Sequence, residues 1–173
     1  MARIIPFTEA RARLTELLDD VETRHEHVVV TRKGRPAAVF VSSEEWGAID
    51  ETLDVLQDEQ TLGDLRQSAK DVKAGRLLSL DDIGASSGVS DLRLTRRAKS
   101  QLGALPEPVR EAVVETLLLI QREPDTTGRR LLGLAWARMT GLWAARAGNY
   151  RILYTHERHG VIVRTIQHKA LPS

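Results

Sequence analysis

The side chains best suited to chemistry in this chain are cations, and they gather in its second half. After Ser86 the sequence carries fourteen Lys and Arg against seven Asp and Glu. An arginine guanidinium matches the oxygens of a phosphate, and histidine transfers protons near neutral pH. Arginines together with His168 and Lys169 near the C-terminus could therefore bind a phosphate group and assist its reaction. The alternative interpretation is a set of solvated cations on a basic sheet.

Other kinds of chemistry find little support in the composition. The 173 residues include no cysteine, which excludes thiol chemistry and disulfides. No group of His, Asp and Glu has the spacing of metal ligands, so we expect no metal and no cofactor. The longest aliphatic run, Leu117–Ile120, is too short to cross a bilayer, and the N-terminus lacks the apolar core of a signal peptide. We expect a cytoplasmic protein without a membrane partner.

The first half of the chain has the opposite charge. Residues 1–85 hold seventeen Asp and Glu against eleven Lys and Arg. The excess lies in residues 44–82, where eleven acids face four cations. Two oppositely charged halves indicate separate partners or halves that bind each other.

Residues 1–43 read as a small α/β unit. Ile4 and Ile5 predict a short strand, and apolar residues at helical spacing predict an amphipathic helix over 9–23. Two β-branched runs, 28–31 and 37–41, flank a cationic turn with Gly34, which predicts a hairpin.

The acidic segment that follows predicts two helices with a narrow apolar stripe. Ser42 and Glu45 have the spacing of a capping box at its start. Burying such a narrow apolar stripe stabilises the helices by less than the chain entropy that they lose on folding. We therefore expect these helices to need a partner surface. The residues expected at that interface are Trp46, Ile49, Leu53, Leu56, Leu62, Leu65, Leu77, Leu78 and Leu80.

The remainder predicts a second domain. Small uncharged residues at 84–89 are typical of a linker. After it, the pattern runs strand, helix, helix and three strands, which predicts two helices packed on an antiparallel sheet. We therefore expect an α+β chain with domains at 1–83 and 90–173.

The first domain resembles the Phd/YefM antitoxins. The matching segments are Thr8–Arg11, Val30–Val39, Glu51–Leu53 and Val72–Arg76. The resemblance implies that residues 1–43 form a homodimer or higher oligomer and bind operator DNA, and that residues 44–83 wrap a toxin.

The same resemblance implies a set of DNA-contacting residues. By motif position, Arg11 and Arg32 would contact DNA, helped by Arg13 and Lys33. Residues 1–40 hold seven cations and six acids, and this small net charge is weak evidence for binding to nucleic acid. The alternative interpretation is a solvated helix face.

The second domain resembles the RelE/ParE toxins. The matching segments are Leu131–Leu134, Gly141–Trp143, Tyr150–Tyr154 and Ile166–Lys169. RelE-like toxins cleave messenger RNA on the ribosome without metal. By motif position, Arg151 would bind the phosphate, and the other catalytic candidates are Arg146, His168 and Lys169.

Three departures from the family pattern keep other activities open, and one is the absence of an acidic residue that some relatives use near Gly133. Leu142 and Ala144 stand where relatives carry lysines, and no tyrosine follows Tyr154. The leading hypothesis is a toxin–antitoxin module in one chain, with an endoribonuclease half inhibited by an antitoxin half that represses transcription. The freed toxin half would then act on ribosomes and messenger RNA. The alternatives are a gyrase-poison toxin of the ParE type, or a DNA-binding repressor with a catalytically inactive toxin half.

Overall fold

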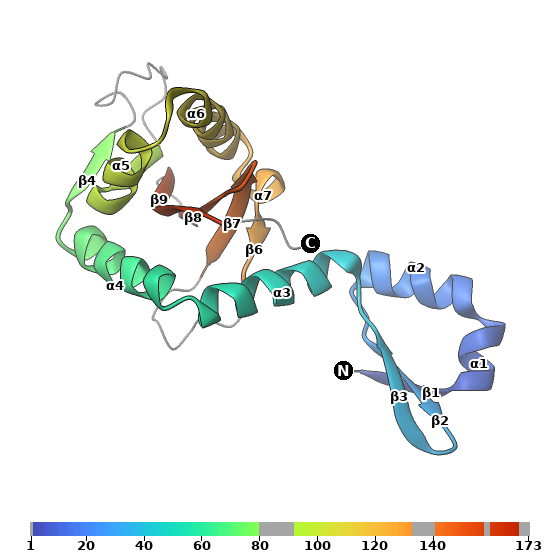
Figure 1. Ribbon diagram of the computed structural model, residues 1–173. Helices are drawn as coiled ribbons and strands as arrows, with labels where there is room; N and C mark the ends of the chain where they lie inside the picture. The colour runs from blue at the N-terminus through green and yellow to red at the C-terminus, as the bar shows by residue number, and fades with distance from the viewer. Residues whose placement is uncertain (1, 80–91, 133–140, 158–159, 170–173) are drawn as a thin grey trace. The chain divides into compact units, whose positions relative to one another are not determined.

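The chain forms two compact units, Met1–Asp50 and Glu51–Ser173. A computed structural model of the protein describes residues 2–79, 92–132, 141–157 and 160–169 (Figure 1). The linker expected at 84–89 lies outside the described residues. Among the described residues, no helix has the length and apolar character needed to span a membrane.

The first unit is built on a small mixed sheet. Strand β1 (Arg3–Pro6) pairs parallel with β2 (Val28–Arg32), which pairs antiparallel with β3 (Arg35–Phe40). Lys33 and Gly34 both have positive φ, 51° and 74°, and form the tight turn that a twisted hairpin favours. The predicted short strand and hairpin are confirmed.

The helical segment of this unit is broken where one continuous helix was expected. Helix α1 (Phe7–Ala12) ends at Arg13, whose φ of −122° and ψ of 27° are not helical, and α2 (Leu14–Arg24) follows. The break lets Ala10 of α1 and Leu17 of α2 enter the same core. The spacing of apolar residues did not predict this break, because the break depends on how the two helices pack against the sheet.

Two helices follow, as the acidic segment predicts. Helix α3 (Ser43–Gln57) is preceded by Ser42, whose Oγ accepts the Glu45 N–H at 3.1 Å and so caps the helix. Helix α4 (Glu59–Lys73) is capped by Asp58, whose carboxylate accepts the Thr61 N–H at 3.0 Å. Such caps satisfy backbone donors that have no partner within the helix.

The second unit contains a sheet in the order β4-β5-β9-β8-β7-β6 among the described residues. Its strands are β4 (Leu77–Ser79), β5 (Leu92–Thr95), β6 (Arg129–Arg130), β7 (Leu142–Ala147), β8 (Tyr150–Glu157) and β9 (Gly160–His168). Its further helices are α5 (Arg96–Gly103), α6 (Glu107–Arg122) and α7 (Pro124–Thr127).

The sheet is mixed, so the expectation of an antiparallel sheet was wrong. Strand β5 pairs parallel with β9, and the other pairs of this sheet are antiparallel. The chain between β5 and β9 includes α5, α6 and a hairpin, which is long enough for the crossover that a parallel pair requires. Side-chain alternation shows that a segment is a strand but not which strand it pairs with.

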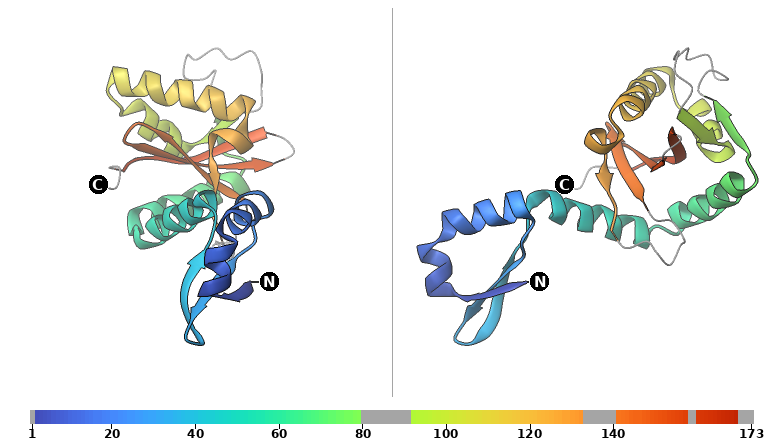
Figure 2. Two further views of the ribbon diagram at one scale, coloured as in Figure 1. Left: turned by 90° about the vertical axis from the view of Figure 1, so that its right-hand side faces the viewer. Right: turned by 180° about the vertical axis from the view of Figure 1, so that it is seen from behind.

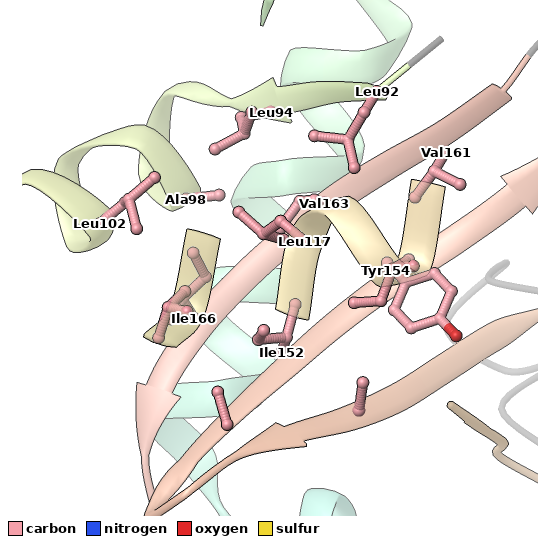
Figure 3. Packing of buried hydrophobic residues seen from close by; sticks show 14 residues of the cluster. Leu92, Leu94, Ala98, Leu102, Leu117, Ile152, Tyr154, Val161, Val163 and Ile166 are labelled. Atoms are coloured by element: carbon pink, nitrogen blue, oxygen red, sulfur yellow. The ribbon is translucent and has the colours of Figure 1, made fainter. Parts of the chain in front are cut away.

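Helices cover both faces of this sheet. Helices α5 and α6 pack on one face over a core that includes Leu94, Leu117, Ile152 and Val163 (Figure 3). Helix α4 and the end of α3 lie on the opposite face, as the left view of Figure 2 shows. The second unit therefore has three layers, and one outer layer comes from the acidic segment.

Candidate functional site

Two of the arginines expected to do chemistry lie on the sheet face that α3 and α4 cover. Arg146 of β7 and Arg151 of β8 are directly opposite each other in the strand pairing. Side chains two residues apart on a strand point to the same face, so Ala144 lies on the side of Arg146 and Leu153 on the side of Arg151. Leu142, Ala144 and Leu153 join the apolar cluster beneath the two helices. The arginines therefore lie at the edge of an apolar contact surface.

Arg151 is the centre of this arrangement. Its side chain is 0% exposed. Its Nη1 donates to Glu51 Oε1 at 3.1 Å and to Asp54 Oδ2 at 2.9 Å. Its Nη2 donates to Thr61 Oγ1 at 3.1 Å and lies 3.7 Å from Asp58 Oδ2. A buried guanidinium is tolerable only with such partners, because removing its charge from water is costly.

The acids of α3 bridge Arg151 to two further cations. Glu51 Oε2 accepts from Arg146 Nη2 at 2.7 Å, so one carboxylate binds two arginines. Asp54 Oδ1 lies 3.0 Å from Lys169 Nζ. We call Arg146, Arg151 and Lys169 the cationic cluster.

A second polar network joins α4 to the sheet. Asp64 is 8% exposed. Its carboxylate accepts from Arg97 Nε at 2.9 Å and from Gln101 Nε2 at 2.8 Å. Gln167 Nε2 and Thr165 Oγ1 each lie 3.2 Å from Asp64 Oδ2. The sequence analysis did not predict this network. Asp64 is next to Leu65 of the apolar stripe, and the pattern gave no sign that its carboxylate is buried.

Asp58 connects the helix cap to the cationic cluster. Burial raises the pKa of its carboxyl group, but the hydrogen bonds from Thr61 and the charges of Lys169 and Arg151 outweigh this effect. The pKa of Asp58 therefore lies below its ordinary value. A carboxylate held by donors and cations stays ionised to lower pH.

His168 is placed apart from the other catalytic candidates. Its ring packs edge-on against Tyr150, with centroids 5.2 Å apart and planes at 82°. The side chain is exposed. The structure thus brings Arg146, Arg151 and Lys169 together around two acids and leaves His168 at the end of β9.

Several of the expected interface residues do contact the sheet of the second unit. Leu56, Leu62 and Leu65 pack with its apolar cluster. Leu77 and Leu78 lie in β4, which pairs with β5. At these positions the acidic segment lies against the sheet of the second unit.

The remaining expected interface residues are more exposed. Trp46 is 61% exposed and Leu53 is 49% exposed, and Ile49 is half-buried. Leu80 lies outside the described residues. On α3 the fully buried apolar side chain of this cluster is Val55, next to the partly buried Leu56. The predicted stripe included Leu56 but not Val55.

The candidate DNA-contacting residues lie in the first unit and are exposed. Arg11, Arg32 and Lys33 have no ion pair within the part of the chain that the structure describes. Arg13 instead pairs with Glu16 at 2.7 Å and with Glu9 at 3.4 Å.

The bonds to Glu16 are also the main reason that the pKa of Arg13 is raised. Arg13 is therefore occupied by neighbours on its own helical segment, whereas the other three cations are open to solvent. Across the described residues, no group of His, Cys, Asp and Glu is arranged to hold a metal ion.

Comparison with known proteins assigns the first part of the chain to a family. Residues 2–75 match the model of the Phd/YefM antitoxins of type II toxin–antitoxin systems. The chain is 41% identical over 80 residues to Antitoxin RelB of Mycobacterium tuberculosis (strain ATCC 25618 / H37Rv), covering 46% of this chain and 90% of that protein. The chain belongs to the Phd/YefM antitoxin family.

One further relative agrees with this assignment. Antitoxin RelF of the same organism is 32% identical over 87 residues, which are 50% of this Phd/YefM chain and 94% of that protein. Among solved structures, the toxin–antitoxin complex RelBE2 from Mycobacterium tuberculosis matches with 30% identity and a TM-score of 0.41. That match covers 46% of this chain and 96% of the chain in the complex.

The family match has a structural consequence for this Phd/YefM chain. It extends from residue 2 to residue 75, past the boundary between the compact units at Asp50. The acids that pair with the cationic cluster, Glu51 and Asp54, therefore belong to the antitoxin segment. The cations that they neutralise lie in the half that follows it.

Proposed function

We propose that this chain is a toxin–antitoxin module in one polypeptide. Residues 1–83 are the antitoxin, residues 84–89 join the halves, and residues 90–173 are a RelE-like endoribonuclease. The antitoxin half inhibits the second half by covering its cationic cluster. The observation that carries the proposal is Arg151, fully buried and paired with Glu51 and Asp54 of the antitoxin segment.

The proposed chemistry is metal-independent cleavage of RNA. The 2′-hydroxyl attacks the adjacent phosphorus, the bond to the 5′-oxygen breaks, one proton leaves the nucleophile and another reaches the leaving oxygen. Arg146, Arg151 and Lys169 suit stabilisation of the charge on the phosphate oxygens. His168 is the candidate for the proton transfers, and for this role the RNA would have to extend from the cationic cluster to the end of β9, where His168 lies.

Inhibition follows from the occupancy of the cluster. The Glu51 and Asp54 carboxylates stand where phosphate oxygens would bind, and α3 and α4 cover the sheet around them. A tether makes docking intramolecular, with an effective concentration on the order of mM. We propose that docking occurs in cis, with exchange between two chains as the alternative arrangement.

The first unit supports a role in DNA binding as a dimer. Arg11, Arg32 and Lys33 are exposed and suited to phosphate contacts. Large apolar side chains are also exposed in this unit, and a second copy of the chain could cover them. These are Ile4, Phe7, Leu14, Leu18, Val39 and Trp46. We propose that residues 1–43 dimerise on operator DNA and repress transcription.

A second candidate function for residues 90–173 is a gyrase poison. It is favoured by Leu142 and Ala144, which are buried apolar residues where RNA-cleaving relatives carry lysines. A third candidate, an inactive toxin half serving as a structural arm of a repressor, follows from the same departure.

Expression of residues 90–173, with and without residues 1–83, tests these candidates. The proposal expects growth arrest with cleavage of messenger RNA on ribosomes, relieved by residues 1–83. A DNA-damage response without RNA cleavage would select the gyrase poison. Harmless expression of a folded domain would select the inactive arm.

A further inference from the structure

Helix α4 buries a row of polar residues beside the apolar Leu65. Thr61, Asp64, Ser68 and Asp71 recur at spacings of three and four residues, and all are buried. A helix face that serves only packing is apolar, because buried polar groups need partners. Asp64 is the member of this row whose carboxylate meets several donors from the surface beneath α4. Asp71 pairs instead with Arg76, and Ser68 Oγ has no hydrogen-bond partner among the described residues.

Four side chains converge on the Asp64 carboxylate within the described part of the chain. Arg97 and Gln101 come from α5, and Thr165 and Gln167 come from β9. They approach at 2.8–3.2 Å, with Arg97 on one oxygen and the others on the second. This donor set suits an anion with at least two oxygens.

The Gln101 donor is oriented by the sheet rather than by Asp64. Its Oε1 accepts the Ile166 N–H at 2.9 Å. The Thr165 hydroxyl has one proton, which it donates either to this Oε1 at 2.9 Å or to Asp64 Oδ2 at 3.2 Å. Strand β5 pairs with β9 only as far as Val163, so Gln101 replaces a strand partner for Ile166. Because its oxygen is engaged there, its NH₂ group must point toward Asp64.

The charge of the donor set selects a monoanion. Only Arg97 carries a formal charge among the four donors, so one negative charge balances it. A phosphodiester has one negative charge and two free oxygens, as Asp64 does. Arg97, Gln101 and Gln167 also line a cavity of about 420 Å³, together with the acid Asp58 but without Asp64. A group larger than a carboxylate could extend into this cavity, with its neutral part toward Asp58.

Gln167 connects this position to the cationic cluster. Its Nε2 faces Asp64, while its Oε1 lies 3.5 Å from Arg151 Nη2. The two anion positions are therefore separated by one side-chain amide. Neighbouring phosphates of one strand could occupy both.

We propose that Arg97, Gln101, Thr165 and Gln167 form a second phosphodiester-binding site, which Asp64 fills in this chain. This inference rests on the proposed function in one respect, which is that the ligand is the backbone of a nucleic acid. In the inhibited chain, Asp64 stands in for one phosphodiester, and the acids of α3 stand in for the next.

The test uses the full chain and small anions at constant ionic strength. Asp64→Ala empties the site, and titration calorimetry measures binding of dimethyl phosphate, inorganic phosphate and acetate. We expect Asp64→Ala to bind dimethyl phosphate roughly tenfold or more tightly than the unmodified chain, since charge-assisted hydrogen bonds are restored. Adding Arg97→Ala or Gln101→Ala should abolish the gain.

The matched control is Asp71→Ala, which removes another buried carboxylate of α4, one that pairs with Arg76. It should gain no anion binding. If Asp64→Ala does not fold, Asp64→Ser also removes the charge and keeps a hydroxyl that can accept a hydrogen bond from the donors around it.

Three results would overturn the inference: equal binding by the unmodified chain and Asp64→Ala, binding that persists after Arg97→Ala, or binding of acetate alone. Tighter binding of inorganic phosphate than of dimethyl phosphate would overturn the assignment to a diester. The proposed function fails separately, through harmless expression of residues 90–173, and specific binding of dimethyl phosphate would then still support the site.

Discussion

Glu51 shows how one antitoxin carboxylate holds two cations of the second half. Its oxygens contact Arg146 at 2.7 Å and Arg151 at 3.1 Å. This carboxylate is needed mainly because Arg151 is fully buried, and removing the carboxylate leaves part of that buried charge uncompensated.

Glu51→Ala should therefore destabilise the chain by about 3 kcal/mol. Denaturant unfolding at neutral pH measures the loss. Glu111→Ala, an exposed position on α6, is the control and should change stability by less than about 0.5 kcal/mol. Equal effects of the two substitutions would contradict the role assigned to Glu51.

Arg151→Ala should relieve the growth arrest expected from residues 90–173, because the phosphate loses its central cation. Growth curves and cleavage of messenger RNA measure the effect, and circular dichroism checks the fold. Arg122→Ala, an exposed arginine on α6, should leave the arrest unchanged. Full toxicity of a folded Arg151→Ala variant would reject the assignment.

Asp58→Asn should weaken the acid-range pH dependence of stability. The pKa of Asp58 is lowered in the folded chain, so its ionised form adds stability above its unfolded pKa of about 3.9. That contribution is lost as the pH falls through the folded pKa. Unfolding from pH 7 to pH 2 should show the two proteins converging at the acid end, and parallel curves would count against this linkage.

At the scale of elements, the acidic helices dock through a face that combines charge and apolar contact. Val55 is 0% exposed and packs with Leu65 against Leu142 and Leu153 of the sheet. Leu53, two residues earlier on the same helix, is 49% exposed. Position around the helix therefore decides which apolar residues contribute to docking.

Val55→Glu should cost about 3 kcal/mol, because it places a charge in a fully buried apolar site. Leu53→Glu is the matched control on the same helix and should cost less than about 1 kcal/mol. Thermal and denaturant unfolding of the full chain compares them. A larger loss from Leu53→Glu would show that the other side of α3 provides the anchor.

At the scale of the whole molecule, the antitoxin family segment and the compact units do not share a boundary. The family match ends at residue 75, while the units divide after Asp50. The acidic tail therefore folds as part of the unit that it is proposed to inhibit, and its stability is tied to that of the sheet.

This arrangement predicts that unfolding of the second unit is independent of protein concentration. Docking in cis is unimolecular, so a hundredfold dilution should move its Tm by less than about 1 °C, whereas assembly between chains makes Tm concentration-dependent. Hydrogen exchange at β8 during thermal unfolding reports on this unit. A Tm that falls steadily on dilution would favour exchange of the acidic helices between two chains.

The sequence by itself determined the local elements and the separation of charge. Helical spacing, the cap at Ser42 and the Gly34 turn indicated α3 and the hairpin, because these depend on residues close together in the chain. Motif positions also indicated Arg146 and Arg151 as candidates.

Only the tertiary structure decided which groups meet. The break at Arg13, the parallel pairing of β5 with β9 and the burial of Asp64 depend on partners distant in sequence. Periodicity cannot report such partners, because it records which face of an element is apolar and not what lies opposite. The pairing of Glu51 with Arg151, a hundred residues apart, arises from the same long-range packing.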